Sequence, residues 1–167
     1  MPVRRHTAAL IITSALFAAG VVAPADAQPG NGNANGHQKL HCRAFHASGV
    51  GVDDGMGNTT ADISRGKRLI ATSYGDFDVT GVDAAGVASF TGTIDLVFKA
   101  GALKALVVGT LDTVSGEFTS TSDTVTGTGD RADVTGWLTF SGVEDLDGLT
   151  FTETVHGKLC VPKKKQH

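Results

Sequence analysis

The feature that most constrains the fold of this chain is an alternation of apolar and polar residues with a period of two. Residues 149–160 read Leu-Thr-Phe-Thr-Glu-Thr-Val-His-Gly-Lys-Leu-Cys, and residues 90–99 and 134–141 alternate in the same way. Successive side chains of a β-strand point to opposite faces of the sheet, so each segment has one apolar face. The pattern predicts half-buried strands. Beyond residue 27, a helical period is suggested only around residues 60–67.

Short turns that contain glycine separate the alternating segments, at 82–86, 99–101, 114–116 and 145–148. Links of this length join antiparallel neighbours. The predicted strands cover residues 39–47, 68–81, 87–98, 103–113, 117–122, 124–128, 134–141 and 149–160. We therefore predict an all-β, antiparallel up-and-down barrel of about eight strands, because closure removes the exposed edges of such a sheet. A two-sheet sandwich is the alternative.

The first 27 residues have the pattern of an export signal. Two arginines precede an apolar run over residues 8–23, and Ala25-Asp26-Ala27 places small residues at the positions that a signal peptidase reads. The run is shorter than the ~20 residues that span a bilayer. We therefore predict a cleaved signal peptide rather than a membrane anchor, and a secreted, extracellular protein without a membrane span.

We expect the exported protein to begin at or near Gln28, because the small-x-small exit ends at Ala27. N-terminal sequencing of the extracellular protein measures this directly. A first residue of Met1 or Pro2 on the exported chain would show that the segment is not removed.

Cleavage after residue 27 leaves one domain with two short flanking segments. Residues 28–38 predict a flexible, Gly- and Asn-rich leader, residues 39–161 the barrel domain, and residues 162–167 a basic tail. The whole chain has 14 Lys and Arg against 17 Asp and Glu, and three of the basic residues are in this tail. An acidic domain without a basic face argues against a nucleic-acid partner.

The two cysteines, Cys42 and Cys160, lie near the two ends of the predicted domain. An even number of cysteines in an exported chain indicates a disulfide, and with two cysteines only one pairing exists. A lone pair so far apart in the sequence lacks the paired ligand spacing of a zinc site. We predict that the bond joins the first strand to the last, with Cα atoms ~5–6 Å apart.

Residues 126–142 read Thr-Gly-Thr-Gly-Asp-Arg-Ala-Asp-Val-Thr-Gly-Trp-Leu-Thr-Phe-Ser-Gly. This segment resembles the Gly-Thr-Gly turn and the following strand of β-barrels of the allene oxide cyclase and dirigent type, and the last strand resembles secreted bacterial members of that group. The resemblance implies a barrel that holds an apolar ligand in its lumen, and in some members a cyclisation guided by shape. Asp130 and Arg131 stand where the plant pattern has an aromatic residue, so the resemblance implies the fold and no catalytic residue.

Glu153 is the strongest candidate for a functional side chain. It shares its strand face with Phe151 and Leu159, so parity places a carboxyl group on the apolar, inner face. Burial favours the neutral form of a carboxyl group, which suits Glu153 to anchor a ligand beside Phe151 or to act as a general acid. The alternatives are a hydrated position near a barrel mouth, or an ion pair with Arg43.

Two further groups offer metal ligands. If the cysteines face each other in an antiparallel ladder, His46 faces His156 on the same side of the sheet. A zinc site normally has at least one more protein ligand, so an exposed histidine pair is favoured. The acidic loops 53–58 and 144–147 offer oxygen ligands without the spacing of a calcium loop. No metal is therefore predicted.

The chain contains no Gly-x-Ser-x-Gly, His-Glu-x-x-His or phosphate-binding glycine motif, so no cofactor is predicted. Three functions stay open: a lipocalin-like barrel that binds a small apolar ligand, a shape-guided cyclase or isomerase, and a solid-cored extracellular interaction protein. An enzyme is the less favoured hypothesis, and a lumen of ~300 Å³ or more would favour binding or catalysis over a solid core. The bulky residues able to fill the lumen are Phe90, Phe98, Phe118, Phe140 and Phe151.

Overall fold

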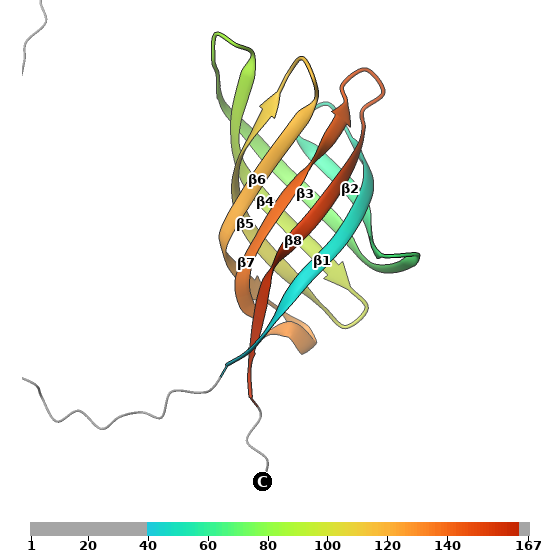
Figure 1. Cartoon of the computed structure of the whole chain (residues 1–167), viewed down its shortest axis with the longest axis vertical. Helices are drawn as coiled ribbons and strands as arrows, with labels where there is room; N and C mark the ends of the chain where they lie inside the picture. The colour runs from blue at the N-terminus through green and yellow to red at the C-terminus, as the bar shows by residue number, and fades with distance from the viewer. Residues whose placement is uncertain (1–39, 164–167) are drawn as a thin grey trace, which may run out of the picture. The chain divides into compact units, whose positions relative to one another are not determined.

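Residues 40–163, which the computed structural model describes, form a closed barrel of eight antiparallel strands (Figure 1). Each strand pairs with the next one in the sequence, and β8 pairs with β1 to close the barrel. The predicted up-and-down barrel is confirmed, and the sandwich is excluded because every strand has a partner on both sides. The elements are β1 (Leu40–Asp53), β2 (Asn58–Arg65), β3 (Arg68–Val82), β4 (Val87–Phe98), β5 (Gly101–Asp112), β6 (Glu117–Gly127), the short helix η1 (Gly129–Arg131), β7 (Thr135–Asp145) and β8 (Thr150–Pro162).

The strand prediction was wrong in two places: it missed one strand and divided another into two. Most of residues 60–67, where a helical period was suggested, belong to β2, whose Ala61 and Ile63 point into the barrel. Residues 117–122 and 124–128, predicted as two strands, belong mainly to the single strand β6. A register shift between Ser122 and Val125 interrupts the alternation, and the Ser122 hydroxyl donates a hydrogen bond to the Thr124 carbonyl at 2.7 Å. Because this β-bulge interrupts the alternation of apolar and polar residues, the sequence pattern indicated a strand boundary here.

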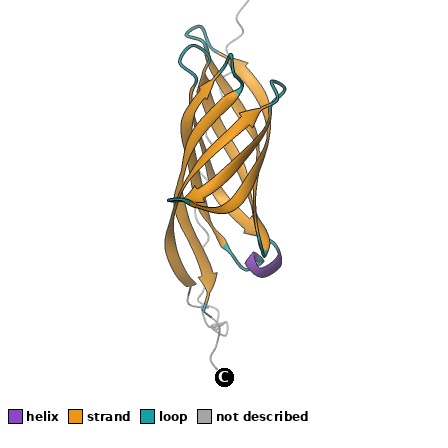
Figure 2. Ribbon diagram, turned by 90° about the vertical axis from the view of Figure 1, so that its right-hand side faces the viewer, coloured by secondary structure: helices purple, strands orange, loops and turns teal. Residues whose placement is uncertain are grey.

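The two ends of the barrel differ in what they carry. Four connections lie at what we call the open end: residues 54–57, 83–86, 113–116 and 146–149 (the upper end in Figure 1). The opposite, closed end carries the β2–β3 and β4–β5 turns, both ends of the described chain, and η1, which Figure 2 shows against the lower rim.

The half of the barrel toward the closed end is packed with aliphatic side chains. Each contributes roughly 1.5–3 kcal/mol when it is fully removed from water. The fully buried members are Ile63, Leu96, Leu103, Val125, Leu138 and Val155. This packed half holds the strands in place, and the parts of the same strands toward the open end surround the candidate site.

Arg131 covers the closed end. Its guanidinium lies 3.6 Å from the centre of the Phe98 ring, a cation–π contact, and partial burial lowers its pKa. The turn that carries Arg131 is held by backbone hydrogen bonds from Thr128 to Ala102 and from Asp130 to Ala100. Phe98 therefore packs against the Arg131 guanidinium at the closed end and does not fill the middle of the lumen.

The predicted disulfide between Cys42 and Cys160 is confirmed, and it joins β1 to β8. The two Cα atoms are 3.9 Å apart, which is closer than the predicted ~5–6 Å, because the residues are direct partners in the ladder. The bond thus fastens the strand pair that closes the barrel.

Several expectations fall outside the described residues. The predicted signal peptide, the leader and all but the first two residues of the predicted tail belong to residues 1–39 and 164–167. Between residues 40 and 163, no helix is long and apolar enough to cross a bilayer.

Candidate functional site

A cavity of about 310 Å³ occupies the half of the barrel toward the open end. Its walls are mainly aromatic and aliphatic, and all eight strands contribute to them. A few polar groups lie among them: Thr59, Ser73, Ser120 and the carboxyl groups of Asp53, Glu144 and Glu153. The main apolar lining residues are Phe77, Phe90, Ile94, Phe118, Phe140 and Phe151.

Glu153 points into this cavity from the middle of the inner face of β8. Its side chain is 8% exposed, and its neighbours Phe151 and Val155 at the same parity are also buried. The structure therefore places Glu153 on the face that strand parity predicts. The alternation in the sequence could not predict how far Glu153 lies from the barrel mouth, and the structure places it inside the lumen.

A glycine on each neighbouring strand flanks Glu153. Gly49 on β1 and Gly142 on β7 are its direct partners on the two neighbouring strands. A Cβ atom on Gly49 would lie 2.7 Å from both Cγ and Oε1 of Glu153, and one on Gly142 would lie 2.9 Å from its Cα. Atoms do not approach so closely, so a side chain at Gly49 would displace the carboxyl group, whereas one at Gly142 would overlap the backbone of β8 and the Phe118 ring.

We expect Gly49→Ala to lower the free energy of unfolding by about 1–3 kcal/mol, because the added methyl group overpacks the site. It would overlap Glu153 and also Ile63, whose Cδ1 would be 2.9 Å away. Gly81→Ala is the matched control, since a Cβ there meets no atom within 4 Å. Urea unfolding measures both variants. Equal stability for the two would show that Gly49 is not needed for packing.

Burial dominates the electrostatics of Glu153. No residue from 40 to 163 forms a hydrogen bond or ion pair with it, its carboxyl oxygens face the cavity, and loss of hydration raises its pKa to about 7. Glu144, nearer the open end, also has a raised pKa, first because of burial and second because of the negative charge on Asp53. No Lys, Arg or His side chain of the described barrel lines the cavity. The site is thus apolar and carries only acidic ionisable groups.

Arg43 does not form the ion pair with Glu153 that was the alternative explanation for this carboxyl group. It lies toward the start of β1, opposite Leu159, and its Nε donates a hydrogen bond to Nε2 of His41 at 2.8 Å. Its side chain is exposed and does not line the cavity. Parity placed Arg43 on the same side as Glu153, but the two residues are at different heights in the barrel.

His46 and His156 face each other in the ladder, as the cysteine pairing predicts. Their ring centres are 5.4 Å apart on the outer face of the barrel, away from the cavity. Across the described part of the chain, no three His, Cys, Asp or Glu side chains are grouped so as to hold a metal ion. The pair therefore lies apart from the candidate site.

The acidic loops use their carboxylates to hold their own turns. Asp54 accepts hydrogen bonds from the side-chain amide of Asn58 and from the backbone N–H groups of Asn58 and Met56, and these bonds, the side-chain one first, lower its pKa. Oδ1 of Asp145 accepts from the N–H groups of Asp147 and Gly148 in the same manner. Such Asx turns explain these residues without a bound calcium ion.

Some lining residues were not predicted to line a cavity: Asp53 and Glu144 were considered only as oxygen ligands of the acidic loops, and Phe77 and Ser73 were not singled out. Glu144 has the parity of Phe140, and Asp53 has the parity of Gly49, so extending each strand by a few residues would have found them. Phe77 and Ser73 lie at alternate positions of β3 and were also within reach of that argument. Their convergence on one cavity depends on the closure of the barrel.

Comparisons with protein-family models, with curated proteins and with solved structures found no match to this chain. The fold is therefore described by its architecture, an eight-stranded antiparallel closed β-barrel with a disulfide between β1 and β8.

Proposed function

We propose that this protein binds a small apolar ligand in the lumen of its barrel. The observation that carries the proposal is the cavity of about 310 Å³, lined by aromatic side chains and containing the buried carboxyl group of Glu153. Ligand sites are commonly concave, mostly apolar and equipped with few polar groups that orient the ligand. We propose further that binding takes place outside the cell, on the basis of the export pattern in residues 1–27.

The cavity counts against the solid-cored alternative. Four of the five phenylalanines that could have filled the lumen line its wall instead: Phe90, Phe118, Phe140 and Phe151. An eight-stranded barrel can be filled completely by its side chains, and the half toward the closed end is filled in this way. The open half is not, which supports a ligand there.

A shape-guided cyclase or isomerase is the second candidate, and the protonation of Glu153 favours it. A carboxyl group with a pKa of about 7 can both give and take a proton near neutral pH, as a general acid or base must. The resemblance to barrels of the allene oxide cyclase and dirigent type points to the same kind of chemistry. The enclosed wall would then hold a flexible substrate in the conformation that cyclises.

Native mass spectrometry of the exported protein tests the proposal without a known ligand. A co-purified small molecule that leaves when the protein is unfolded supports binding in the lumen. The neutral fluorescent probe N-phenyl-1-naphthylamine provides a second test, because its emission increases in apolar surroundings. Failure of both tests would remove the support for a ligand site.

We expect Ser120→Leu to weaken binding of this probe at least about tenfold, because the larger side chain occupies the cavity that Ser120 lines. Thr121→Leu is the matched control, since Thr121 is the next residue on β6 and is exposed on the outer face. A fluorescence titration gives both affinities, and near-ultraviolet circular dichroism confirms the fold of each variant. Equal affinity for the two variants would place the probe outside the cavity.

A further inference from the structure

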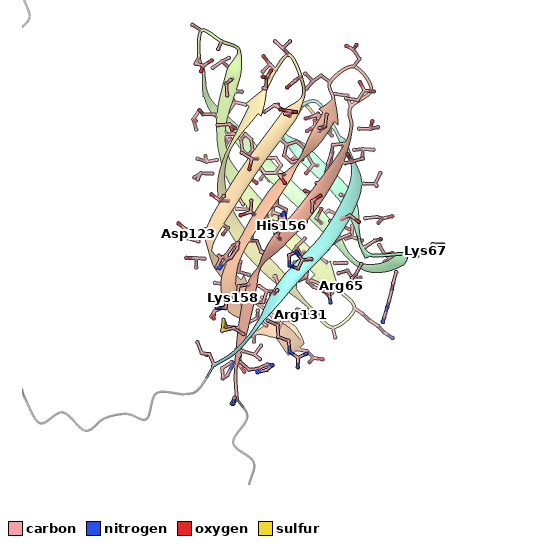
Figure 3. The ribbon with its side chains drawn as sticks, viewed as in Figure 1. Arg65, Lys67, Asp123, Arg131, His156 and Lys158 are labelled. Carbon is pink, nitrogen blue, oxygen red and sulfur yellow. A yellow bond between two sulfur atoms is a disulfide. The ribbon has the colours of Figure 1, made fainter. Side chains whose placement is uncertain are left out.

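The basic residues of the described barrel are confined to one half, whereas acidic residues occur in both. The segments that form the open half, residues 50–60, 75–93, 107–119 and 142–154, contain no Lys, Arg or His. The basic residues of the described chain lie toward the closed end, where Figure 3 labels Arg65, Lys67, Arg131 and Lys158. The acidic residues of the open half are Asp53, Asp54, Asp76, Asp78, Asp83, Asp112, Glu117, Glu144, Asp145, Asp147 and Glu153.

The need to form tight turns explains why some of these acidic residues are present. Asp83 and Asp112 each accept backbone hydrogen bonds within their loops, as Asp54 and Asp145 do. These carboxylates still carry negative charge while they hold the turns, and the pKa of Asp112 is lowered by its hydrogen bonds to Ser115 and Val114. A ligand that approaches the open end therefore meets a negative potential, whatever the origin of the charges.

Turn formation does not explain Glu153. It is buried to more than nine-tenths, its carboxyl group points into the cavity, and it has no hydrogen-bond or ion-pair partner among residues 40–163. The side chain is largely removed from water without a partner from the barrel, and the absence of a side chain at Gly49 leaves room for its carboxyl group. A cationic group on a ligand would give Glu153 the partner that the barrel itself does not supply.

We propose that the ligand of this barrel is a hydrophobic amine, whose apolar body fills the cavity and whose protonated nitrogen binds the carboxylate of Glu153. This inference rests on the proposed function and names the class of ligand. Fatty acids and other anionic amphiphiles are disfavoured by the same arrangement, because a carboxylate in the cavity would face Glu153 and Glu144 with no cation nearby.

A change of ligand affinity with pH can be assigned to Glu153 because few other ionisable groups line the cavity. Asp53 from β1 and Glu144 from β7 are the ionisable groups that line the cavity with it, and the β3, β4 and β6 walls contribute serines and apolar residues. Binding of an ammonium group requires ionised Glu153. Because the pKa of Glu153 is about 7, its ionised fraction increases about tenfold between pH 6 and pH 8, and amine affinity should follow it.

Isothermal titration calorimetry with three probes of equal length tests the proposal: octylamine, octanol and octanoate. We expect octylamine to bind at least about tenfold more tightly than octanol at pH 8, and octanoate to bind more weakly than both. Ethylamine, which has the charge without the apolar chain, should bind far more weakly than octylamine. Binding of octanol tests the proposed function by itself, because it needs the cavity and no charge.

Glu153→Gln separates the charge from the shape of the site. We expect this variant to lose the preference for octylamine over octanol by about tenfold or more, and to lose the increase in octylamine affinity between pH 6 and pH 8. If octanol binds and octylamine is not preferred, or if ethylamine binds as tightly as octylamine, the amine proposal fails while the cavity remains a ligand site. If none of the eight-carbon probes binds, both proposals fail.

Discussion

Removing the disulfide with the double variant Cys42→Ser/Cys160→Ser should lower the free energy of unfolding by about 4–5 kcal/mol. The bond closes a loop with a sequence separation of 118 residues. In the chain-entropy model, a cross-link across so long a loop restricts the unfolded chain strongly. The disulfide also holds β1 against β8, the first and last strands of the described chain. Such a loss is a large part of the total stability of a small domain.

Urea unfolding of the oxidised protein, the reduced protein and the double serine variant measures this contribution. The reduced protein is the internal control, because it lacks the bond and keeps both sulfur atoms. We expect it and the serine variant to unfold at similar urea concentrations. A loss below about 1 kcal/mol in both would mean that the ladder between β1 and β8 closes the barrel without the covalent bond.

The second large effect concerns pH and Glu153. Burial raises the pKa of this group from its ordinary value of 4.5 to about 7 in the folded barrel. The folded state therefore holds the proton more tightly than the unfolded state does. The stability that this group contributes is fully present below pH 4.5 and is lost as the pH rises through 7, by about 3 kcal/mol in total. Glu153→Gln carries no titrating group and should not show this loss.

The difference in unfolding free energy between Glu153→Gln and the wild-type protein isolates this effect. We expect the variant to gain about 3 kcal/mol relative to wild type between pH 4.5 and pH 8, measured by urea unfolding at a series of pH values. Carboxyl groups with lowered pKa values, such as Asp54, lose stability at low pH in both proteins and cancel. Glu144→Gln is the control, with a smaller change of the same sign. A constant difference across this range would contradict an unpaired, buried Glu153.

These two predictions bear on function in different ways. The disulfide stabilises the barrel on its outer face and does not line the cavity. Glu153 has the opposite effect near neutral pH, since its ionisation inside an apolar lumen lowers the stability of the fold. A residue that destabilises the folded state, and for which Gly49 leaves room, is the kind of group expected at a functional site.

The sequence by itself determined the strand faces, the antiparallel barrel and the disulfide. Period-two alternation is a local property, so it placed Glu153 on the inner face of 149–160 without any tertiary information. With two cysteines only one pairing exists, and the register that follows from it set His46 opposite His156. The alternation failed at the β6 bulge and in the polar β2, where few large apolar residues mark the inner face.

Only the tertiary structure decided the depth of Glu153 and the presence of a cavity around it. Depth depends on how the strands are staggered when the barrel closes, and no single strand contains that information. The same stagger separated Arg43 from Glu153, and brought Gly49 and Gly142 to its two sides from distant parts of the chain. The lack of basic residues in one half of the described barrel became visible in the same way, because the antiparallel meander brings alternate connections to the same end.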